Sequence, residues 1–336
     1  MTRTVKLAVD AMGGDIGAAV TTAAVAAFVR DNPHVCVDLF ATEGVLDGYV
    51  DKGLLGDLDG KITAIACGPQ VENNEKPSSA VRGKRSSSMA RAIEAVSSGQ
   101  ADACVSAGNT GALMALGMVL LKNLTGISRP AICGVIPTLK NSALVLDLGA
   151  NIDCSSIQLH QFAHLGSLTS QRIFNLKSPR VRLLNVGLET NKGPQFIQEA
   201  GELLSADDRL NYCGYLEADQ LFSGDTDVIV CDGMSGNIAL KASEGTAAMI
   251  NAIYLAELQR NWVTRLSAAL FIRSTASLNQ RLNPSRYNGA YLLGLRGVVV
   301  KSHGAADTRA FYQALNIAAR AESNNLPKDL ESIMPL

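Results

Sequence analysis

The 336-residue chain is predicted to be an α/β protein, a three-layer α/β/α arrangement with a doubly wound, mostly parallel sheet. Three observations predict this fold class. Short apolar runs alternate with longer stretches of helical periodicity, and most of these runs end in a glycine-rich or small-residue loop. The composition is also apolar, with 47% hydrophobic and 18% charged residues, as expected for strands that are buried on both faces of a sheet.

The predicted strands are short and rich in Val, Ile, Leu and Ala. Two of them flank Asn141 so closely that we expect a hairpin, and therefore one antiparallel strand. The full set is Thr4–Asp10, Val35–Ala41, Lys61–Ala66, Ala103–Ser106, Ala131–Ile136, Ala143–Asp147, Val181–Val186, Asp227–Cys231 and Val298–Ser302.

The predicted helices fill most of the intervals between these strands, as βα units require. They are Ala18–Arg30, Ser88–Ser98, Thr110–Lys122, Ser155–Ile173, Pro194–Leu204 and Ala305–Ala321. The sequence contains no internal repeat, low-complexity tract or proline-rich linker, so we expect a single domain over residues 1–336.

Two segments depart from the alternating pattern. Gly68–Arg85 is long, polar and rich in turn-forming residues, which favours a lid or docking loop. Met249–Leu282 has helical periodicity and is predicted to form a basic amphipathic projection at about residues 249–282. Its apolar stripe holds Leu258, Trp262, Leu266 and Leu270, and the charges near it are Arg260, Arg265, Arg273 and Arg281 against the single acid Glu257.

Composition and charge exclude several classes of protein. A net charge of -1 gives no global field that recruits nucleic acid, so we expect no nucleic-acid partner. The N-terminal residues show no signal peptide, and no apolar run reaches the roughly 20 residues of a membrane-spanning helix. The seven cysteines are scattered without a Cys-x-x-Cys pair, which predicts a cytoplasmic location.

Two glycine-rich loops are candidate anion sites. Asp10-Ala-Met-Gly-Gly-Asp15 follows the first strand, and Ser106-Ala-Gly-Asn-Thr-Gly-Ala112 joins a strand to the start of a helix. Glycines let backbone N–H groups approach an anion, and the helix dipole favours negative charge there. A tight βα turn remains an alternative for the first loop, and simple helix capping by Asn109 or Thr110 for the second.

Four further loops follow other predicted strands: Asp147–Asn151, Asn185–Gly193, Gly233–Lys241 and Lys301–Gly304. Because ligands of open α/β sheets bind at the carboxyl ends of strands, these loops are expected to form one crevice. That crevice would hold Asn151, Lys192, Asn237, Lys241 and His303, which suit an anion and a developing oxyanion. The alternatives are ordinary solvated lysines and a histidine with a structural role.

The usual motifs of other enzyme classes are absent from the sequence. There is no Gly-x-x-x-x-Gly-Lys-Ser/Thr, Gly-x-Gly-x-x-Gly or Gly-x-Ser-x-Gly motif, so nucleotide binding and a serine nucleophile are not supported. Cys104, Cys154 and Cys231 lie near loops but are expected to be core residues. His160 and His164, like His34, show no acidic or cysteine partners in the sequence, so we predict no metal site and no cofactor.

Six motifs carry a resemblance to a known family. In chain order they are Asp10-Ala-Met-Gly-Gly-Asp15, Lys84-Arg-Ser-Ser-Ser-Met89, Ser106-Ala-Gly-Asn-Thr-Gly-Ala-Leu113, Asp147-Leu-Gly-Ala-Asn151, Gly236-Asn-Ile-Ala-Leu-Lys241 and Lys301-Ser-His-Gly-Ala-Ala306. Together they resemble the bacterial phosphate acyltransferases of the PlsX family, from residue 4 to about residue 321. One departure is Ala18, where family members often carry a proline.

The resemblance implies a fold similar to that of isocitrate/isopropylmalate dehydrogenases and phosphotransacetylases, in a homodimer. It implies transfer of a long-chain fatty acyl group from acyl carrier protein to inorganic phosphate, giving acyl phosphate for phospholipid biosynthesis. Inorganic phosphate is itself a nucleophile, so the missing nucleophile motif is expected. Peripheral contact with the inner face of the membrane, and with the membrane glycerol-phosphate acyltransferase, is left open.

Roles are assigned to the matching positions as hypotheses. Phosphate attacks the thioester directly, with Lys192 and Asn237 stabilising the oxyanion and His303 assisting proton movement toward the thiolate. Substrate binding is assigned to Gly13, Gly14, Asp15, Gly108, Asn109, Thr110, Gly111, Asn151 and Lys241. Docking of acyl carrier protein is assigned to Arg82, Lys84 and Arg85, and contact with a membrane or a second subunit to Trp262 and Leu266.

Two other functions compete with this hypothesis. One is a short-chain phosphotransacetylase that acts on coenzyme A thioesters. The other is a membrane-surface scaffold without catalytic activity, in which the glycine loops are only turns. The sequence does not predict acyl chain length, the dimer surface or the strength of membrane contact.

Overall fold

The computed structural model describes residues 4–50, 60–260, 287–323, 326 and 330. Within them the strands form one sheet in the order β3-β2-β1-β4-β11-β10-β5-β6-β9-β7-β8. The strands are β1 (Val5–Asp10), β2 (Val35–Thr42), β3 (Ile62–Cys67), β4 (Ala103–Ser106), β5 (Ala131–Pro137), β6 (Ser142–Leu146), β7 (Arg180–Leu184), β8 (Asn211–Leu216), β9 (Val228–Val230), β10 (Ala290–Leu293) and β11 (Val298–Lys301).

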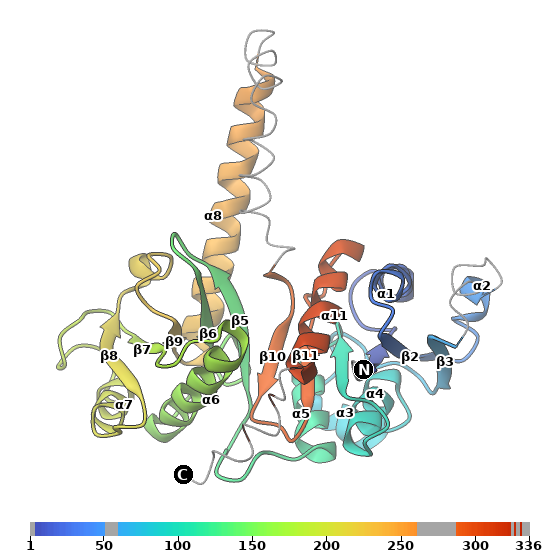
Figure 1. The fold of residues 1–336 in the computed structure, drawn as a ribbon, viewed down its shortest axis with the longest axis horizontal. Coiled ribbons are helices and arrows are strands. Elements are labelled where there is room, and N and C mark those ends of the chain that lie inside the picture. The colour runs from blue at the N-terminus through green and yellow to red at the C-terminus, as the bar shows by residue number, and fades with distance from the viewer. Residues whose placement is uncertain (1–3, 51–59, 261–286, 324–325, 327–329, 331–336) are drawn as a thin grey trace.

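Helices cover both faces of this sheet, which confirms the predicted three-layer, doubly wound α/β fold (Figure 1). They are α1 (Ala18–Asp31), α2 (Asp47–Val50), α3 (Pro77–Gly83), α4 (Ser88–Ser97), α5 (Thr110–Leu120), α6 (Ser156–Phe174), α7 (Gln195–Ser205), α8 (Gly233–Gln259) and α11 (Thr308–Ser323), with a 3-10 turn at Ala218–Gln220. Helices α1, α11, α6 and α7 share one apolar core, and α4 and α5 share a second on the opposite face.

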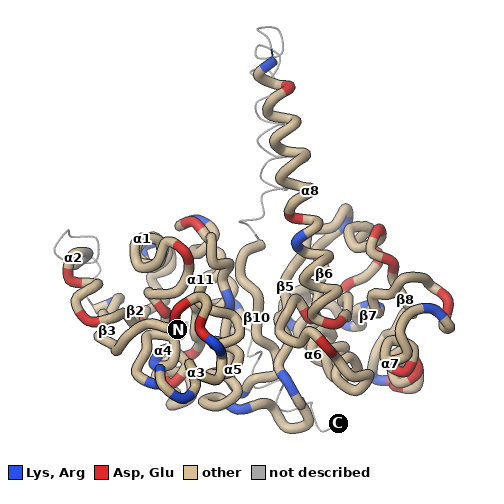
Figure 2. The backbone as a smooth tube through the Cα atoms, turned by 180° about the vertical axis from the view of Figure 1, so that it is seen from behind, with Lys and Arg blue, Asp and Glu red and all other residues tan. Residues whose placement is uncertain are grey.

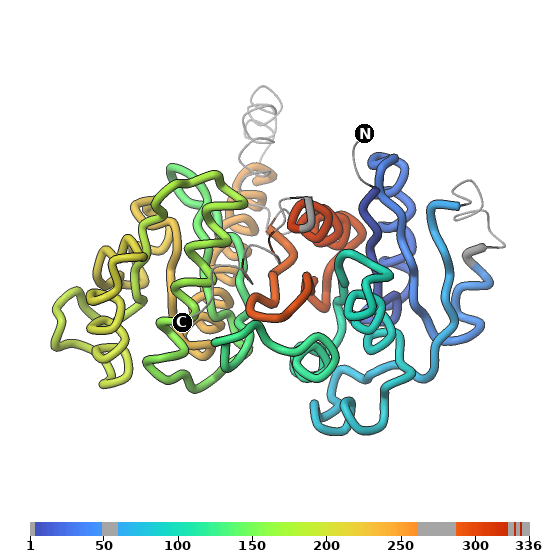
Figure 3. Tube along the Cα trace, turned by 60° about the horizontal axis from the view of Figure 1, so that its bottom comes forward, coloured from blue at the N-terminus to red at the C-terminus, as the bar shows by residue number. Residues whose placement is uncertain are grey.

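Successive residues of the central strands point into different cores. In β1, Leu7 and Val9 belong to the core beneath α1 and α11, whereas Ala8 belongs to the core beneath α4 and α5. This alternation buries both faces of a parallel strand, which explains why the predicted strands are almost wholly apolar. Figure 3, in which the bottom of the molecule comes forward, shows α1 beside α11. The rings of Phe28 on α1 and Tyr312 on α11 make an edge-on contact, with centroids 5.1 Å apart.

The sheet reverses direction in its middle. Strands β3, β2, β1, β4 and β11 are mutually parallel, β10 is antiparallel to β11 and to β5, and β5 is antiparallel to β6. Strands β6, β9, β7 and β8 then continue in parallel. The β5–β6 pair confirms the hairpin that was predicted around Asn141. The carboxyl ends of β1, β4 and β11 therefore leave one edge of the sheet, and those of β6, β9 and β7 leave the other.

Several elements differ from the sequence prediction. Strands β8 and β10 were not expected, and the segment Gly68–Arg85, predicted as a loop, contains α3. The predicted loop Gly233–Lys241 is wrong, because these residues are the first turns of α8. Asp232 caps this helix by accepting a hydrogen bond from Ser235 N at 2.8 Å, and a satisfied cap favours the helix despite Gly233 and Gly236 near its start.

Helix α8 leaves the body of the molecule as a long projection (Figure 1). The projection was predicted to start near Met249, whereas the helix begins at Gly233. Figure 2 shows few charges along it, and Arg260 pairs with Glu257 at 3.2 Å. Its exposed apolar side chains include Met249, Ile250, Ile253 and Leu255. The described residues do not include the remainder of the predicted projection, namely Trp262, Leu266, Leu270, Arg265, Arg273 and Arg281.

No helix in the described ranges combines the length and the apolar character that a bilayer crossing requires.

Candidate active site

The ends of three adjacent parallel strands place Asp10, Ser106 and Lys301 in register. The Asp10 carboxylate is buried and accepts hydrogen bonds from Ser88 Oγ at 2.6 Å and from Ser106 Oγ at 2.7 Å. Ser106 Oγ in turn accepts from Gly108 N at 3.0 Å. Burial raises the pKa of Asp10, and it lowers the pKa of Lys301 to about 8. This network fixes the bases of the first two glycine loops.

The two glycine loops pack directly against each other. A Cβ atom built on Gly13 would lie 2.4 Å from Gly108 N, so a side chain at Gly13 does not fit. Gly14 has a φ of 93° and lies against Gly304, whose carbonyl accepts from Asp15 N at 2.8 Å. The structure therefore brings Gly13, Gly14, Asp15 and Gly108 together with the loop after β11. Close packing of the loops therefore explains why glycine occupies these positions, in addition to the proposed role in binding an anion.

The second glycine loop also holds the segment before α3. Asn109 Oδ1 accepts from Ala112 N at 3.0 Å, which caps α5. Asn109 Nδ2 donates to the carbonyls of Asn73 and Glu75 at 2.9 Å each, while Pro77 packs against Gly111. The side chain of Asn109 thus caps a helix, as the alternative to anion binding had it, and also holds a neighbouring segment. The first N–H groups of α5, at Thr110 and Gly111, are of the kind that a helix leaves for a ligand.

His303 and Lys241 meet at this edge of the sheet, with His303 Nε2 3.1 Å from Lys241 Nζ. The other ring nitrogen, Nδ1, accepts from Ala305 N at 3.1 Å, so a neutral ring carries its proton on Nε2. Burial is the main cause that lowers the pKa of His303, followed by the charge of Lys241. Two donors therefore face each other, and a negatively charged oxygen between them would accept from both.

Asn151 and Asn237 lie at the other edge of the sheet, beside the loop after β6. Asn151 is buried, and its Nδ2 donates to Pro130 O at 2.8 Å and to Asp147 Oδ2 at 2.9 Å. Asp147 also accepts from Asn151 N at 2.6 Å, so this pair shapes the loop. Asn237 is exposed on the first turn of α8 and packs against Gly149. Asn151 is thus enclosed by protein, whereas Asn237 faces outward.

Lys192 lies in the loop after β7, the strand next to β9 in the sheet. Its side chain is exposed, and its backbone closes the loop through Lys192 N to Glu189 O at 3.1 Å and Asn185 Nδ2 to Lys192 O at 3.1 Å. Because α8 begins directly after β9, Asn237 on this helix and Lys192 in the loop after β7 follow adjacent parallel strands.

The residues that were expected to line a single crevice fall into two groups, because the strands on the two sides of the sheet run in opposite directions. Gly13, Gly14, Asp15, Gly108, Asn109, Thr110, Gly111 and His303 follow β1, β4 and β11, whereas Asn151, Lys192 and Asn237 follow β6, β7 and β9. Helix α8 connects the groups. Asn237 and Lys241 are one turn apart on the same face of α8, about 6 Å along its axis, and Lys241 reaches His303.

Arg82, Lys84 and Arg85 lie at the end of α3 and in the turn before α4 (Figure 2). Arg82 and Arg85 are exposed, and Lys84 is half-buried. Arg82 Nε donates to Ser78 O within α3 at 3.2 Å. Helix α3 packs against α5, which begins in the second glycine loop. The turn with Arg82, Lys84 and Arg85 therefore lies at the end of a helix that neighbours this loop.

Sequence reasoning missed the buried network of Asp10, Ser88, Ser106 and Lys301. A signal was present, since Asp10 and Ser106 each end a predicted strand and Lys301 is the next-to-last residue of a third, Val298–Ser302. The expectation that His160 and His164 lack an acidic partner is wrong, because Asp207 accepts from both. Burial lowers the pKa of His164, and hydrogen bonds from Arg209 hold the pKa of Asp207 well below its usual range.

The fold and the site define a doubly wound α/β protein in which loops after the strands bring together backbone N–H groups, a lysine and a histidine. Solved structures with this fold include a phosphotransacetylase from Streptococcus pyogenes, with a TM-score of 0.60, 18% identity and coverage of 95% of this chain and 94% of that chain. The EutD phosphotransacetylase from Staphylococcus aureus has a TM-score of 0.59 at 18% identity, with the same coverage of each chain.

Sequence comparison is more specific. Residues 5–329 match the model of a family described as "Fatty acid synthesis protein". A protein from Halorhodospira halophila named "Phosphate acyltransferase" is 43% identical over 97% of this chain and 95% of its own length. One of the same name from Pseudomonas syringae pv. syringae is 46% identical over 97% and 95%. The chain belongs to the phosphate acyltransferase family.

Proposed function

We propose that this chain transfers a long-chain acyl group from acyl carrier protein to inorganic phosphate, forming an acyl phosphate for phospholipid synthesis. Family membership supports acyl transfer to phosphate. The observation that carries the site assignment is the pair of donors, His303 Nε2 and Lys241 Nζ, 3.1 Å apart beside two glycine loops. At present two hydrogen-bond donors face each other. A phosphate oxygen bound between them would accept a charge-assisted hydrogen bond from each.

In the proposed reaction, phosphate held at Lys241 and His303 attacks the thioester carbonyl carbon. The carbonyl oxygen becomes an oxyanion that accepts from Asn237 Nδ2 and Lys192 Nζ, one turn of α8 away from the phosphate. Collapse breaks the carbon–sulfur bond and releases the acyl phosphate. The proton of the attacking phosphate passes to the departing sulfur. His303, with its proton on Nε2, serves this reaction as a donor to phosphate and not as a base.

No cysteine is required by this direct transfer. Among the described residues all the cysteines are free thiols, and Cys104, Cys133, Cys154 and Cys231 are buried. Burial raises the pKa of the Cys154 thiol to about 12 and also raises that of Cys231. A thiol of this kind is a poor nucleophile at neutral pH.

We therefore expect Cys154→Ala and Cys231→Ala, the cysteines nearest the loop after β6, to keep the turnover of folded protein within about threefold of the parent. Their cost should be in stability, on the order of 1–2 kcal/mol, since each leaves a small cavity. Turnover and thermal unfolding measure the two effects separately. A stable acyl group on any cysteine, detected by mass spectrometry during turnover, would contradict direct transfer.

The acyl donor is proposed from the basic turn formed by Arg82, Lys84 and Arg85. Acyl carrier proteins are acidic, and a protein donor must dock outside the site while its acyl chain enters. A positive rim beside the second glycine loop suits that step. Coenzyme A would not need this surface.

Reversal of charge in the variant Arg82→Glu/Arg85→Glu is expected to raise KM for acyl carrier protein donors by about tenfold at low salt, with KM for phosphate unchanged. The matched control is Lys177→Glu/Arg30→Glu, which changes net charge equally at two exposed sites elsewhere. Equal donor KM values for the two double variants at low salt would remove the docking role.

The most direct test of the proposed function compares acyl donors. Purified protein, phosphate and either a long-chain acyl carrier protein thioester or a short-chain coenzyme A thioester are incubated, and acyl phosphate is trapped with hydroxylamine. We expect kcat/KM to be higher for the acyl carrier protein donor. Preference for short-chain coenzyme A thioesters would identify a phosphotransacetylase, and no product from either donor would favour a scaffold.

The exposed apolar side chains of α8, Met249, Ile250, Ile253 and Leu255, are proposed to contact a second copy of the chain. Burying such a surface between two copies removes it from water. Anionic membrane is the alternative occupant of the same helix. Sedimentation of Ile253→Glu, with and without anionic vesicles, separates the two contacts.

A further inference from the structure

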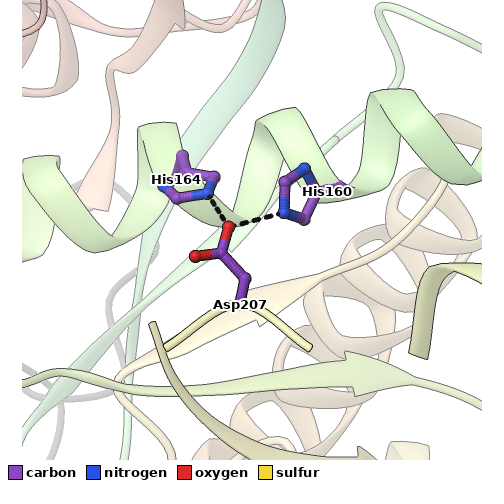
Figure 4. A group of neighbouring side chains, drawn as sticks. All are labelled: His160, His164 and Asp207. Atoms are coloured by element: carbon purple, nitrogen blue, oxygen red, sulfur yellow. Dashed lines mark hydrogen bonds and ion pairs between the residues drawn. The ribbon is translucent and has the colours of Figure 1, made fainter. Parts of the chain in front are cut away.

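A cluster of two histidines and one aspartate lies between α6 and the turn from α7 to β8. His160 and His164 are one turn apart on α6, and their Nε2 atoms both lie 2.8 Å from Asp207 Oδ2 (Figure 4). These three ligand atoms lie within 4.8 Å of one another. The rings meet edge to face, with centroids 4.9 Å apart. None of the three residues belongs to the candidate active site.

The hydrogen bonds of this cluster are crowded around a single oxygen. Asp207 Oδ2 accepts from both rings and also from Arg209 Nη2 at 2.7 Å. A carboxylate oxygen has two lone pairs, so three donors share it poorly. Arg209 Nη2 also lies 3.4 Å from His164 Nε2, so two donors face each other there. A cation in place of the two ring protons would turn both rings into acceptors and relieve this crowding.

We propose that His160, His164 and Asp207 bind a divalent transition-metal ion of the zinc class, which ties α6 to the α7–β8 turn. Two imidazoles and one carboxylate form a ligand set that zinc takes, and water would complete the tetrahedron. With bonds of about 2.0–2.2 Å to the metal, each nitrogen should move to roughly 3.3 Å from the oxygen. That is an opening of about half an ångström from the observed 2.8 Å.

Arg209 is the competitor for this site and also the means to test it. Its Nε and backbone N–H donate to Asp207 Oδ1, at 2.8 and 3.1 Å, and these bonds are compatible with a metal on Oδ2. Its Nη2 donates to Asp207 Oδ2 at 2.7 Å, and this hydrogen bond must break when the ion binds to that oxygen. Removing this guanidinium should therefore tighten metal binding, because it removes both a competing donor and a repelling charge.

The test uses the full chain, stripped with a chelator, and Zn²⁺ or Co²⁺ as probes. Equilibrium dialysis is expected to show one saturable equivalent of Zn²⁺. Bound Co²⁺ should give the visible spectrum of a tetrahedral nitrogen and oxygen site, without the thiolate charge-transfer bands that binding at cysteine would produce. His160→Gln and His164→Gln should weaken binding at least tenfold, whereas His34→Gln, at an exposed histidine elsewhere, should not.

Arg209→Gln is expected to bind Zn²⁺ several-fold more tightly than the parent. Circular dichroism checks that each variant is folded. Should His164→Gln fail to fold, His160→Gln and Asp207→Asn carry the comparison. No saturable equivalent in the parent, or equal binding by His160→Gln and His34→Gln, would overturn the metal site. Loss of stability without metal binding in Arg209→Gln would assign the cluster to an ion-pair clamp.

Discussion

Lys241→Met is expected to lower kcat/KM for phosphate by about 100-fold, because it removes a charged donor from the proposed phosphate position. KM for the acyl donor should change little. Lys241 is exposed and pairs with Glu244 at 2.7 Å, so loss of the lysine also leaves Glu244 unpaired. Glu244→Gln controls for that charge and should retain most activity. Steady-state kinetics with phosphate varied, together with thermal unfolding, measure these effects.

His303 offers a sharper choice between two roles. If Nε2–H donates to phosphate, His303→Gln should retain much of the activity, because its amide also carries a donor and Gln does not titrate. If His303 moved a proton, glutamine and alanine would be equally poor. We expect His303→Ala to lose about 100-fold in kcat/KM for phosphate and His303→Gln to lose about tenfold or less. Equal losses in the two variants would restore the proton-transfer role.

Much of the fold could be predicted because its strands are buried on both faces. Leu7, Ala8 and Val9 serve two different cores, so the strand is a continuous apolar run that is visible in the sequence. Strand β8 lies at the edge of the sheet, where Asn211 is exposed and Gly214 interrupts the run, and it was missed. The start of α8 was obscured by Gly233 and Gly236, since glycine disfavours helices. A Cβ on Gly236 would lie 2.0 Å from Asp147 O, so packing explains that glycine.

The composition of the site could be predicted more readily than its arrangement. Strand ends identify candidate residues, but the direction of each strand decides which ends meet. That direction alternates through β10, β5 and β6, and of these β10 is a short element that no strong sequence signal marks. Contacts between distant positions were also invisible, as with His160 and Asp207, which are 47 residues apart. The enclosure of Asn151 was invisible for the same reason, because its Nδ2 donates to the carbonyl of Pro130, a residue 21 positions away that directly precedes β5.

Lys192→Ala and Asn237→Ala are each expected to lower kcat by about 100-fold, with KM for phosphate nearly unchanged. The reason is that both side chains are proposed to donate to the oxyanion, which exists only in the transition state. Both are exposed, and the loop around Lys192 is closed by its backbone atoms, so folding should be retained. Single-turnover rates of acyl phosphate formation, at saturating phosphate, isolate the chemical step.

Matched controls separate this role from general effects of charge and helix stability. Lys177→Ala removes an exposed lysine just before β7, at the end of that strand opposite Lys192, and Ile238→Ala changes the exposed residue next to Asn237. Both controls should keep turnover within about twofold. If the two donors act on one oxyanion, the double variant should lose less than the product of the single losses, because effects at a shared centre are not additive. Parental rates in both single variants, with unchanged melting, would move the oxyanion site away from β7 and α8, toward the N–H groups at the start of α5.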